Sequence, residues 1–243
     1  MKIKFIIILG LLFLIGCSKS STELFELSKE NLKNNQDDLA VKNLEKLLEK
    51  YPNDSLASQA LYKLSTIYLN WQNDPASGLG ALDKLVKTYP ESKQAKQAKL
   101  EIEEFPDYIL NKTESLRKKE MVKEALDHLM YLTENHSNHQ LISKAQYMLG
   151  DIYMNDLRDF KTAIQEYRKV IENHKGSIQE PHALFMIGYI YANVLNDMQS
   201  AKIEYEEFLN RFPEHELSPS VKFEIEYLGK SVDEIPALKH ITT

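Results

Sequence analysis

The 243-residue sequence predicts an all-α fold, a solenoid of helix-turn-helix repeats closed by a C-terminal capping helix. Three observations predict this class. Segments 145–174 and 183–212 align without a gap, at an offset of 38 in the numbering. Apolar residues within these segments recur with the 3.6-residue period of an amphipathic helix. The chain has only 8 Gly and 8 Pro, too few for the many tight turns of a β-sandwich or barrel.

The internal alignment defines about five repeats with this period. Segment 60–89 joins at the same phase, and further steps of 38 lead from Pro90 to Pro52 and from Ala163 to Ala125. The spacing between the second and third repeats is 47, so nine extra residues lie there. The repeats end near Pro52, Pro90, Ser137, Lys175 and Pro213. We therefore expect a tandem array of helical hairpins.

Each repeat is predicted to contain two helices. The second helix has one apolar face, as at Ala201, Tyr205, Phe208 and Phe212, with Lys and Glu opposite. The first helix places Gly188 where a neighbouring helix must approach closely. Proline at the end of a repeat stops the second helix and starts the turn.

Two regions depart from this pattern. The first helix of the third repeat must come from 94–118, where Pro106 would break or kink it. Segment 220–230 keeps the repeat phase for half a repeat, which predicts the capping helix, and 231–243 is a tail. The solenoid is therefore expected to span residues 23–230.

The N-terminus has the layout of a secretory signal peptide. Lys2 and Lys4 precede an apolar run over 5–15, which is too short to span a bilayer because a span needs about 20 residues. The single cysteine, Cys17, follows directly in "LIGC", which resembles the lipobox of bacterial lipoproteins. The resemblance implies cleavage of residues 1–16, lipidation of Cys17 and a short lipidated tether over 17–22. Several acyl chains would anchor such a protein stably to a membrane.

Composition argues against binding to nucleic acid or anionic lipid and against stabilisation by disulfide bonds. The net charge is −6, and it becomes −8 once Lys2 and Lys4 are removed with the signal peptide. An acidic chain without a basic block is a poor ligand for nucleic acid or for anionic lipid head groups. No second cysteine is present, so no disulfide framework supports the fold.

No catalytic or cofactor motif emerges from the sequence. There is no glycine-rich phosphate loop, nucleophile elbow or HExxH, and the carboxylates are spread over solvent-facing helix positions. Several histidines lie near turns between repeats, where capping is expected rather than a metal site: His136, His139, His174, His182 and His215. We therefore expect neither an enzyme, nor a cofactor, nor a metal centre.

The repeats resemble the tetratricopeptide repeat, which has a small residue and Gly-x-x-Tyr in its first helix, Ala and an aromatic in its second, and a final Pro. That repeat is about 34 residues long, so we expect the surplus here to lengthen the connection between the two helices. The resemblance implies that the first helices line a concave face. An aromatic set shares one phase there: Tyr62, Tyr147, Phe185 and Phe223, with Leu24 and Ile109 at the corresponding places.

Two interpretations of these candidate groove residues stay open. The aromatic set either holds an extended peptide by stacking or packs as core against the preceding repeat. Asn70, Asn155 and Asn193 share a second phase near the end of the first helix. They either bind a peptide backbone or cap the helix, since Asn tolerates the left-handed conformation.

Lipobox and repeats together resemble the BamD-like outer-membrane lipoproteins, in size and in segments such as "AVKNLEKLLEKYP". That resemblance implies a periplasm-facing scaffold for β-barrel protein assembly, anchored in the outer membrane of a two-membrane bacterium. Ser18 and Lys19, rather than Asp, follow Cys17, as in lipoproteins sent to that membrane; in a one-membrane bacterium the anchor would face outward. Two alternatives remain: a Tol–Pal-associated division coordinator, or an accessory subunit of another envelope complex.

Overall fold

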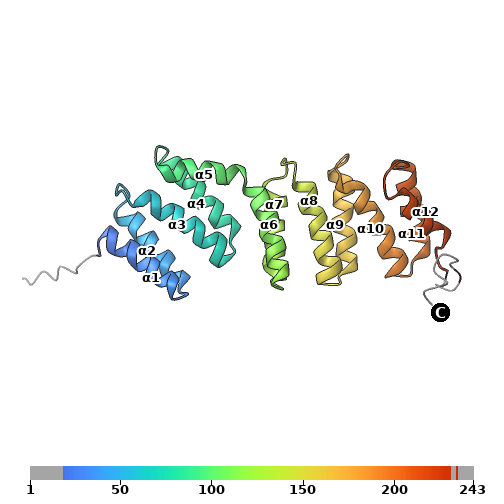
Figure 1. Ribbon diagram of the computed structural model, residues 1–243, viewed down its shortest axis with the longest axis horizontal. Helices are drawn as coiled ribbons and strands as arrows, with labels where there is room; N and C mark the ends of the chain where they lie inside the picture. Colours follow the sequence, from blue (N-terminus) through green and yellow to red (C-terminus); the bar gives the residue numbers. More distant parts are fainter. Residues whose placement is uncertain (1–18, 231–233, 235–243) are drawn as a thin grey trace, which may run out of the picture. The chain divides into compact units, whose positions relative to one another are not determined.

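The computed structural model describes residues 19–230 and residue 234. Cys17 and the signal peptide lie outside this range, as does the tail except for Glu234. The described residues form twelve α-helices and two short π-helical segments and contain no strand (Figure 1). None of these helices is long and apolar enough to cross a membrane. The expected all-α class is therefore confirmed.

The chain forms two compact units. Among the described residues, the first unit comprises 19–72 and 80–98, and the second comprises 73–79 and 99 onwards. The elements of the N-terminal half are α1 (Ser21–Lys33), α2 (Asp37–Lys50), α3 (Ala57–Ile67), η1 (Tyr68–Gln72), α4 (Pro75–Thr88) and α5 (Lys93–Glu103). Within the first unit, α1 packs on α2 and α2 on α3, in the order expected of stacked hairpins.

The second unit contains three complete hairpins and a final helix. Its further elements are α6 (Phe105–Lys118), α7 (Val122–Asn135), α8 (Ile142–Asp151), η2 (Ile152–Asp156), α9 (Phe160–Asn173), α10 (Gln179–Asn193), α11 (Met198–Arg211) and α12 (Ser218–Glu226). Each helix from α6 to α12 packs on the next, and α8 also contacts α10 (Figure 1). The helix predicted over 220–230 exists as α12, whose Val221 is fully buried against this stack.

Pro106 divides the first helix predicted for the third repeat. Helix α5 ends at Glu103, and α6 begins at Phe105 with Pro106 in its first turn. The first turn accepts proline because its backbone N–H groups have no partner within the helix. The nine extra residues are therefore absorbed by an additional helix, and α6 pairs with α7.

Helices begin at equivalent positions in successive repeats because the capping residues recur at those positions. Ser20 and Glu23 form a capping box at the start of α1, two residues earlier than the predicted boundary. Asp159 and Asp197 accept the amides of Thr162 and Ser200 at the starts of α9 and α11. These hydrogen bonds lower the pKa of both carboxyl groups, so the caps stay ionised at neutral pH.

One residue in each connection between paired helices adopts the left-handed conformation. Its position follows the repeat spacing of 38, 47, 38 and 38 along the chain: Asn35, Asn73, Glu120, Arg158 and Asn196. Asn tolerates this conformation better than Glu or Arg, whose longer side chains make no compensating local hydrogen bond. Two repeats therefore use a residue type that is unfavourable at its position.

The expected lengthening of the connections is wrong. In the fourth repeat the surplus extends the first helix itself, because α8 continues into η2 and leaves only 157–159 before α9. The second repeat has the same arrangement, with η1 after α3. A π-helical turn accommodates an extra residue without ending the helix.

The π-helical turn also changes how the first repeat aligns with the second, by one residue. Ser65 Oγ donates to the carbonyl of Tyr62 at 2.9 Å, and Ser28 Oγ donates in the same way to Phe25 at 2.6 Å. Phe25 therefore corresponds to Tyr62, and Leu24, the predicted counterpart, is fully buried one position earlier. The shift arises because α1 lacks the extra π-helical residue present after α3.

The core of the last repeats depends on small residues at the helix crossings. Ala163, Tyr167, Ala201 and Tyr205 are all fully buried in one hydrophobic cluster. The close approach expected at Gly188 is confirmed, since a β-carbon there would lie 2.6 Å from Cε1 of Tyr205. The glycine thus makes room for the aromatic ring of the paired helix.

Candidate peptide-binding groove

The second unit contains an open groove of about 730 Å³. Helices α6, α8 and α10, which are the first helices of three successive repeats, provide its walls together with η2. Its lining residues are Glu114, Arg117, Lys118, Lys144, Tyr147, Met148, Asp151, Asp156, Ile178, Gln179 and His182. The groove therefore lies on the helix set that the tetratricopeptide resemblance associates with peptide binding.

Tyr147 is the aromatic residue of the groove. Its half-buried ring lies 5.2 Å from the ring of Tyr167, which comes from the paired helix α9. The ring of His182 approaches the same tyrosine edge-on, with centroids 6.4 Å apart. Burial raises the pKa of Tyr147, so its phenol stays protonated. Tyr147 and His182 both line the groove, so this aromatic cluster forms part of its surface.

A half-buried carboxyl group, that of Asp151, lies beside this ring. Asp151 accepts a 2.6 Å hydrogen bond from the hydroxyl of Tyr167. Burial raises the pKa of Asp151, while the bond from Tyr167 and the charge of Arg117 oppose that rise. The bond also fixes the orientation of the Tyr167 ring under Tyr147. The floor of the groove is therefore held by hydrogen bonding as well as by packing.

One ion pair joins the two sides of the groove. Arg117 of α6 contacts the same carboxylate oxygen of Asp156 through Nε at 2.8 Å and through a terminal nitrogen at 2.7 Å. Both side chains are about one-quarter exposed. The pair links α6 to the π-helical segment η2, two elements of different repeats. It fixes the wall without adding net charge.

The rim combines an apolar residue with free cations. Ile178 is 78% exposed, the largest exposure among the exposed large hydrophobic residues of the described chain. Lys118 and Lys144 are exposed and form no ion pair among the described residues. Three basic and three acidic residues line the groove in total. Balanced charge together with apolar lining residues suits a polypeptide better than a polyanion.

The predicted aromatic set does not form one continuous surface in this site. Tyr147 lines the groove. Phe185 is half-buried, and its ring lies 6.1 Å from the ring of Tyr205. Tyr147 and Phe185 both pack against the core cluster. Phe223 is 38% exposed and lies 4.7 Å from the ring of Tyr227. Tyr62 belongs to the first unit and is half-buried. Ile109, a predicted counterpart, is fully buried.

The three predicted asparagines are exposed and lie outside the groove lining. Asn70 and Asn155 are within η1 and η2, and Asn193 ends α10 with its amide donating to the carbonyl of Tyr189 at 3.3 Å. The left-handed conformation expected at this phase occurs three residues later in each case, for example at Asn196. The extended first helix displaces the turn by that distance.

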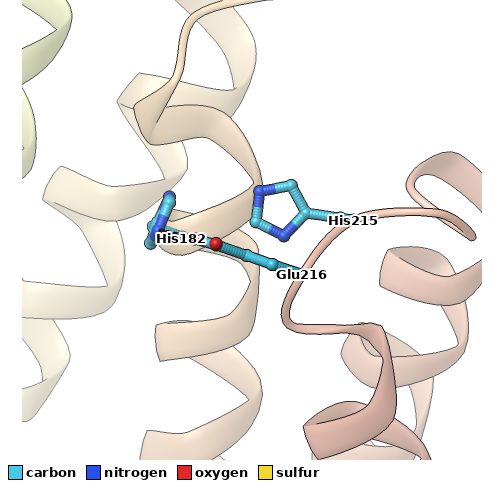
Figure 2. Close-up of side chains that lie close together, drawn as sticks. All are labelled: His182, His215 and Glu216. Carbon is cyan, nitrogen blue, oxygen red and sulfur yellow. Dashed lines mark ion pairs between the residues drawn. The ribbon is translucent and has the colours of Figure 1, made fainter.

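Two of the five turn histidines, His139 and His215, bond to backbone amides at the start of the next helix, as expected of a turn or capping role. His139 and His215 accept the amides of Leu141 and Leu217 through Nδ1, at 3.3 and 3.2 Å. Beyond this expected role, the structure brings His182, His215 and Glu216 together, with ligand atoms within 4.8 Å of one another (Figure 2). His182 comes from α10, and the other two come from the turn before α12 (Figure 2).

Sequence reasoning missed most of the groove residues. Arg117 and Asp156 lie 39 residues apart on different repeats, and Ile178 and Gln179 belong to the start of α10. One signal was present: the repeat alignment places Ile178, an apolar residue, opposite the polar Glu216. An apolar residue at an otherwise polar turn position indicates a local surface requirement.

The fold and groove define a tetratricopeptide-repeat protein. The tetratricopeptide repeat model matches residues 144–177 and 182–215, the fourth and fifth repeats. A second family model, YfiO, described as an outer membrane lipoprotein, matches residues 18–152, more than half of the chain. The chain belongs to this family. No curated protein sequence matches it.

Several solved structures are similar to this chain at low sequence identity. YrrB, described as a tetratricopeptide protein with an unusual peptide-binding site, is 19% identical; the match covers 84% of this chain and 92% of YrrB, with a TM-score of 0.39. MamA from Desulfovibrio magneticus RS-1 is 17% identical over 82% of this chain and 98% of its own, with a TM-score of 0.36. A repeat protein from Parabacteroides merdae is 16% identical over 86% and 73%, with a TM-score of 0.37.

Proposed function

We propose that this protein is a lipid-anchored, non-catalytic scaffold that binds a polypeptide segment of a β-barrel assembly partner in the groove of its second unit. The observation that carries the proposal is the groove over α6, α8 and α10, with the aromatic Tyr147 and the exposed Ile178 among its lining residues. Membership of an outer membrane lipoprotein family supports the envelope setting.

The groove chemistry supports an extended segment with apolar anchors. Tyr147, Met148 and Ile178 provide apolar surface along the lining. Gln179 and the free lysines offer hydrogen-bond donors beside it. Burial of a few apolar side chains of a partner contributes about 25 cal/mol per Å² of apolar area removed from water, before the cost of ordering the segment.

The anchor in this proposal is the lipid on Cys17. Helix α1 begins at Ser21, so only three residues separate Cys17 from the first helical residue. At about 3.4 Å per residue these span at most ~14 Å over the four steps from Cys17 to Ser21. The first unit would therefore lie against the membrane surface.

Affinity purification of the tagged full-length protein from detergent-solubilised membranes, followed by mass spectrometry, tests this proposal. We expect recovery of a β-barrel assembly protein. The Cys17→Ser variant should leave the membrane fraction. Recovery of Tol–Pal or peptidoglycan-synthesis proteins, or of an unrelated envelope complex, would contradict the assembly role and favour one of the alternatives. A Cys17→Ser protein that stays in the membrane fraction through detergent-free washes would contradict the lipid anchor.

A further inference from the structure

A cluster of metal-ligating side chains lies at the junction between the last repeat and the capping helix α12. His182 Nε2 is 4.0 Å from a carboxylate oxygen of Glu216, and the rings of His182 and His215 are perpendicular with centroids 5.4 Å apart (Figure 2). Both histidines are half-buried, whereas Glu216 is 78% exposed. Two imidazoles and one carboxylate thus converge on one point at the protein surface.

His182 already has the arrangement of a metal ligand. Its Nδ1 lies 2.9 Å from the carbonyl of Ile178, one turn earlier in the chain. A carbonyl can only accept, so Nδ1 carries a ring proton, and in the neutral imidazole Nε2, which lies 4.0 Å from a carboxylate oxygen of Glu216, keeps a free lone pair. Metal-bound histidines characteristically hold their second ring nitrogen in this way. The backbone therefore prepares Nε2 for coordination.

The other two ligands need only local movement. Ligands of a tetrahedral zinc ion at about 2.1 Å are about 3.4 Å apart, so ligand atoms that lie within 4.8 Å of one another must close by at most about 1.4 Å. The exposure of Glu216 leaves this residue free to do so. His215 must release the amide of Leu217, because Nδ1 accepts that hydrogen at present. Loss of this cap makes the site weaker than a closed structural zinc site.

The preceding junction provides an internal comparison. The residues one repeat before His182, His215 and Glu216 are Lys144, Ser177 and Ile178. These occupy the same places between the fourth and fifth repeats but offer no imidazole or carboxylate. The complete ligand set is therefore a specific property of the last junction and not a consequence of the repeat.

We propose that His182, His215 and Glu216 bind a divalent transition-metal ion of the zinc class, which fastens the turn before α12 to α10. Imidazole together with carboxylate selects zinc, copper or nickel over magnesium and calcium. Three protein ligands leave a further position for water or for a ligand group from a partner. The ion would secure the C-terminal end of the array, adjacent to the groove that His182 also lines.

Calorimetric titration of the full-length protein in detergent with zinc chloride tests the site. We expect one ion per chain and a rise in the melting temperature. His182→Gln and His215→Ser should each lower the affinity about tenfold or more. Ser92 Oγ accepts the amide of Ala95 at the corresponding turn of an earlier repeat, whereas Ser177 Oγ, one repeat before His215, has no partner among the described residues. Thermal melting of the metal-free His215→Ser protein therefore checks that the variant folds.

His139→Ser is the matched control, because His139 caps its helix as His215 does but belongs to no such ligand cluster among the described residues. This variant should bind zinc like the unchanged protein. Absence of saturable binding would overturn the proposal. So would affinity that is unchanged in both His182→Gln and His215→Ser, because the ion would then occupy other ligands.

Discussion

A β-carbon on Gly150 of α8 would lie 2.5 Å from Cε1 of Tyr167 of α9, closer than non-bonded carbon atoms approach. The absence of a side chain at Gly150 is thus what allows the Tyr167 ring to lie between the paired helices. The same relationship recurs one repeat later between Gly188 and Tyr205. The hydroxyl of Tyr167 then reaches Asp151 on the floor of the groove. The packing of Tyr167 on Gly150 is thus both a recurring feature of the repeat and part of what positions the candidate site.

Gly150→Ala should destabilise the protein by about 1–3 kcal/mol, the usual cost of overpacking a rigid core. Thermal melting of the full-length protein measures the effect. Tyr167→Leu should restore part of the loss in the double variant, since Leu82 and Leu129 occupy the corresponding place in earlier repeats. Gly80→Ala is the control, because its β-carbon would meet nothing within 4 Å. A loss at Gly80 equal to that at Gly150 would contradict the packing explanation.

Glu120→Gly should raise the stability by about 1 kcal/mol, because glycine removes the strain of the β-carbon, although it adds freedom to the unfolded chain. Glu120 has φ of 62°, in the left-handed region that L-residues other than Asn and Asp rarely occupy. The matched variant Glu120→Ala removes the charge but keeps the β-carbon, so it should give no gain. Equal stabilisation by both substitutions in a melting experiment would assign the effect to charge.

Most of the fold could be predicted from the repeat pattern, because each hairpin has the same local contacts. Gly188, Tyr205 and the helix following 213 were predictable, since small and aromatic residues recur at a constant spacing. The π-helical turn after α3 was not, because one extra residue within a helix leaves the hydrophobic spacing of the next helix unchanged. It shifted the counterpart of Tyr62 from Leu24 to Phe25.

The candidate site was predictable only in part. Tyr147 was recognised from its phase, but Arg117 and Asp156 meet only because α6 and η2 are neighbours in space. Ion pairs between repeats depend on side-chain reach, which a one-dimensional alignment does not contain. The convergence of His182 with His215 has the same origin: each residue looked like an isolated turn histidine in the sequence.

Acidification should destabilise the protein through His128. This histidine is fully buried; its Nε2 has no partner among the described residues, and burial lowers its pKa below the ordinary 6.5. The folded state therefore binds fewer protons than the unfolded chain. Its contribution to stability is complete above pH 6.5 and is lost as the pH falls from 6.5 toward the lowered pKa.

His128→Leu should weaken this acid sensitivity, because leucine has no proton to bind and leaves no unpaired buried nitrogen. Melting temperatures of both proteins between pH 8 and pH 5 provide the measurement. The melting temperature of the variant should rise relative to that of the unchanged protein as the pH falls. Parallel curves over the whole range would show that His128 does not carry the effect; His174, whose pKa burial also lowers, would then be the next residue to replace.

Site-specific photo-crosslinking in intact cells tests the groove most directly. A photoreactive residue at position 178, on the groove rim, is compared with one at 203 on α11, since Ile178 and Ile203 are 78% and 56% exposed. We predict a discrete adduct from position 178 that contains a β-barrel assembly protein, and none from 203. The Tyr147→Ala substitution should abolish that adduct. Adducts formed only from position 203, or a position-178 adduct unaffected by Tyr147→Ala, would contradict binding in this groove.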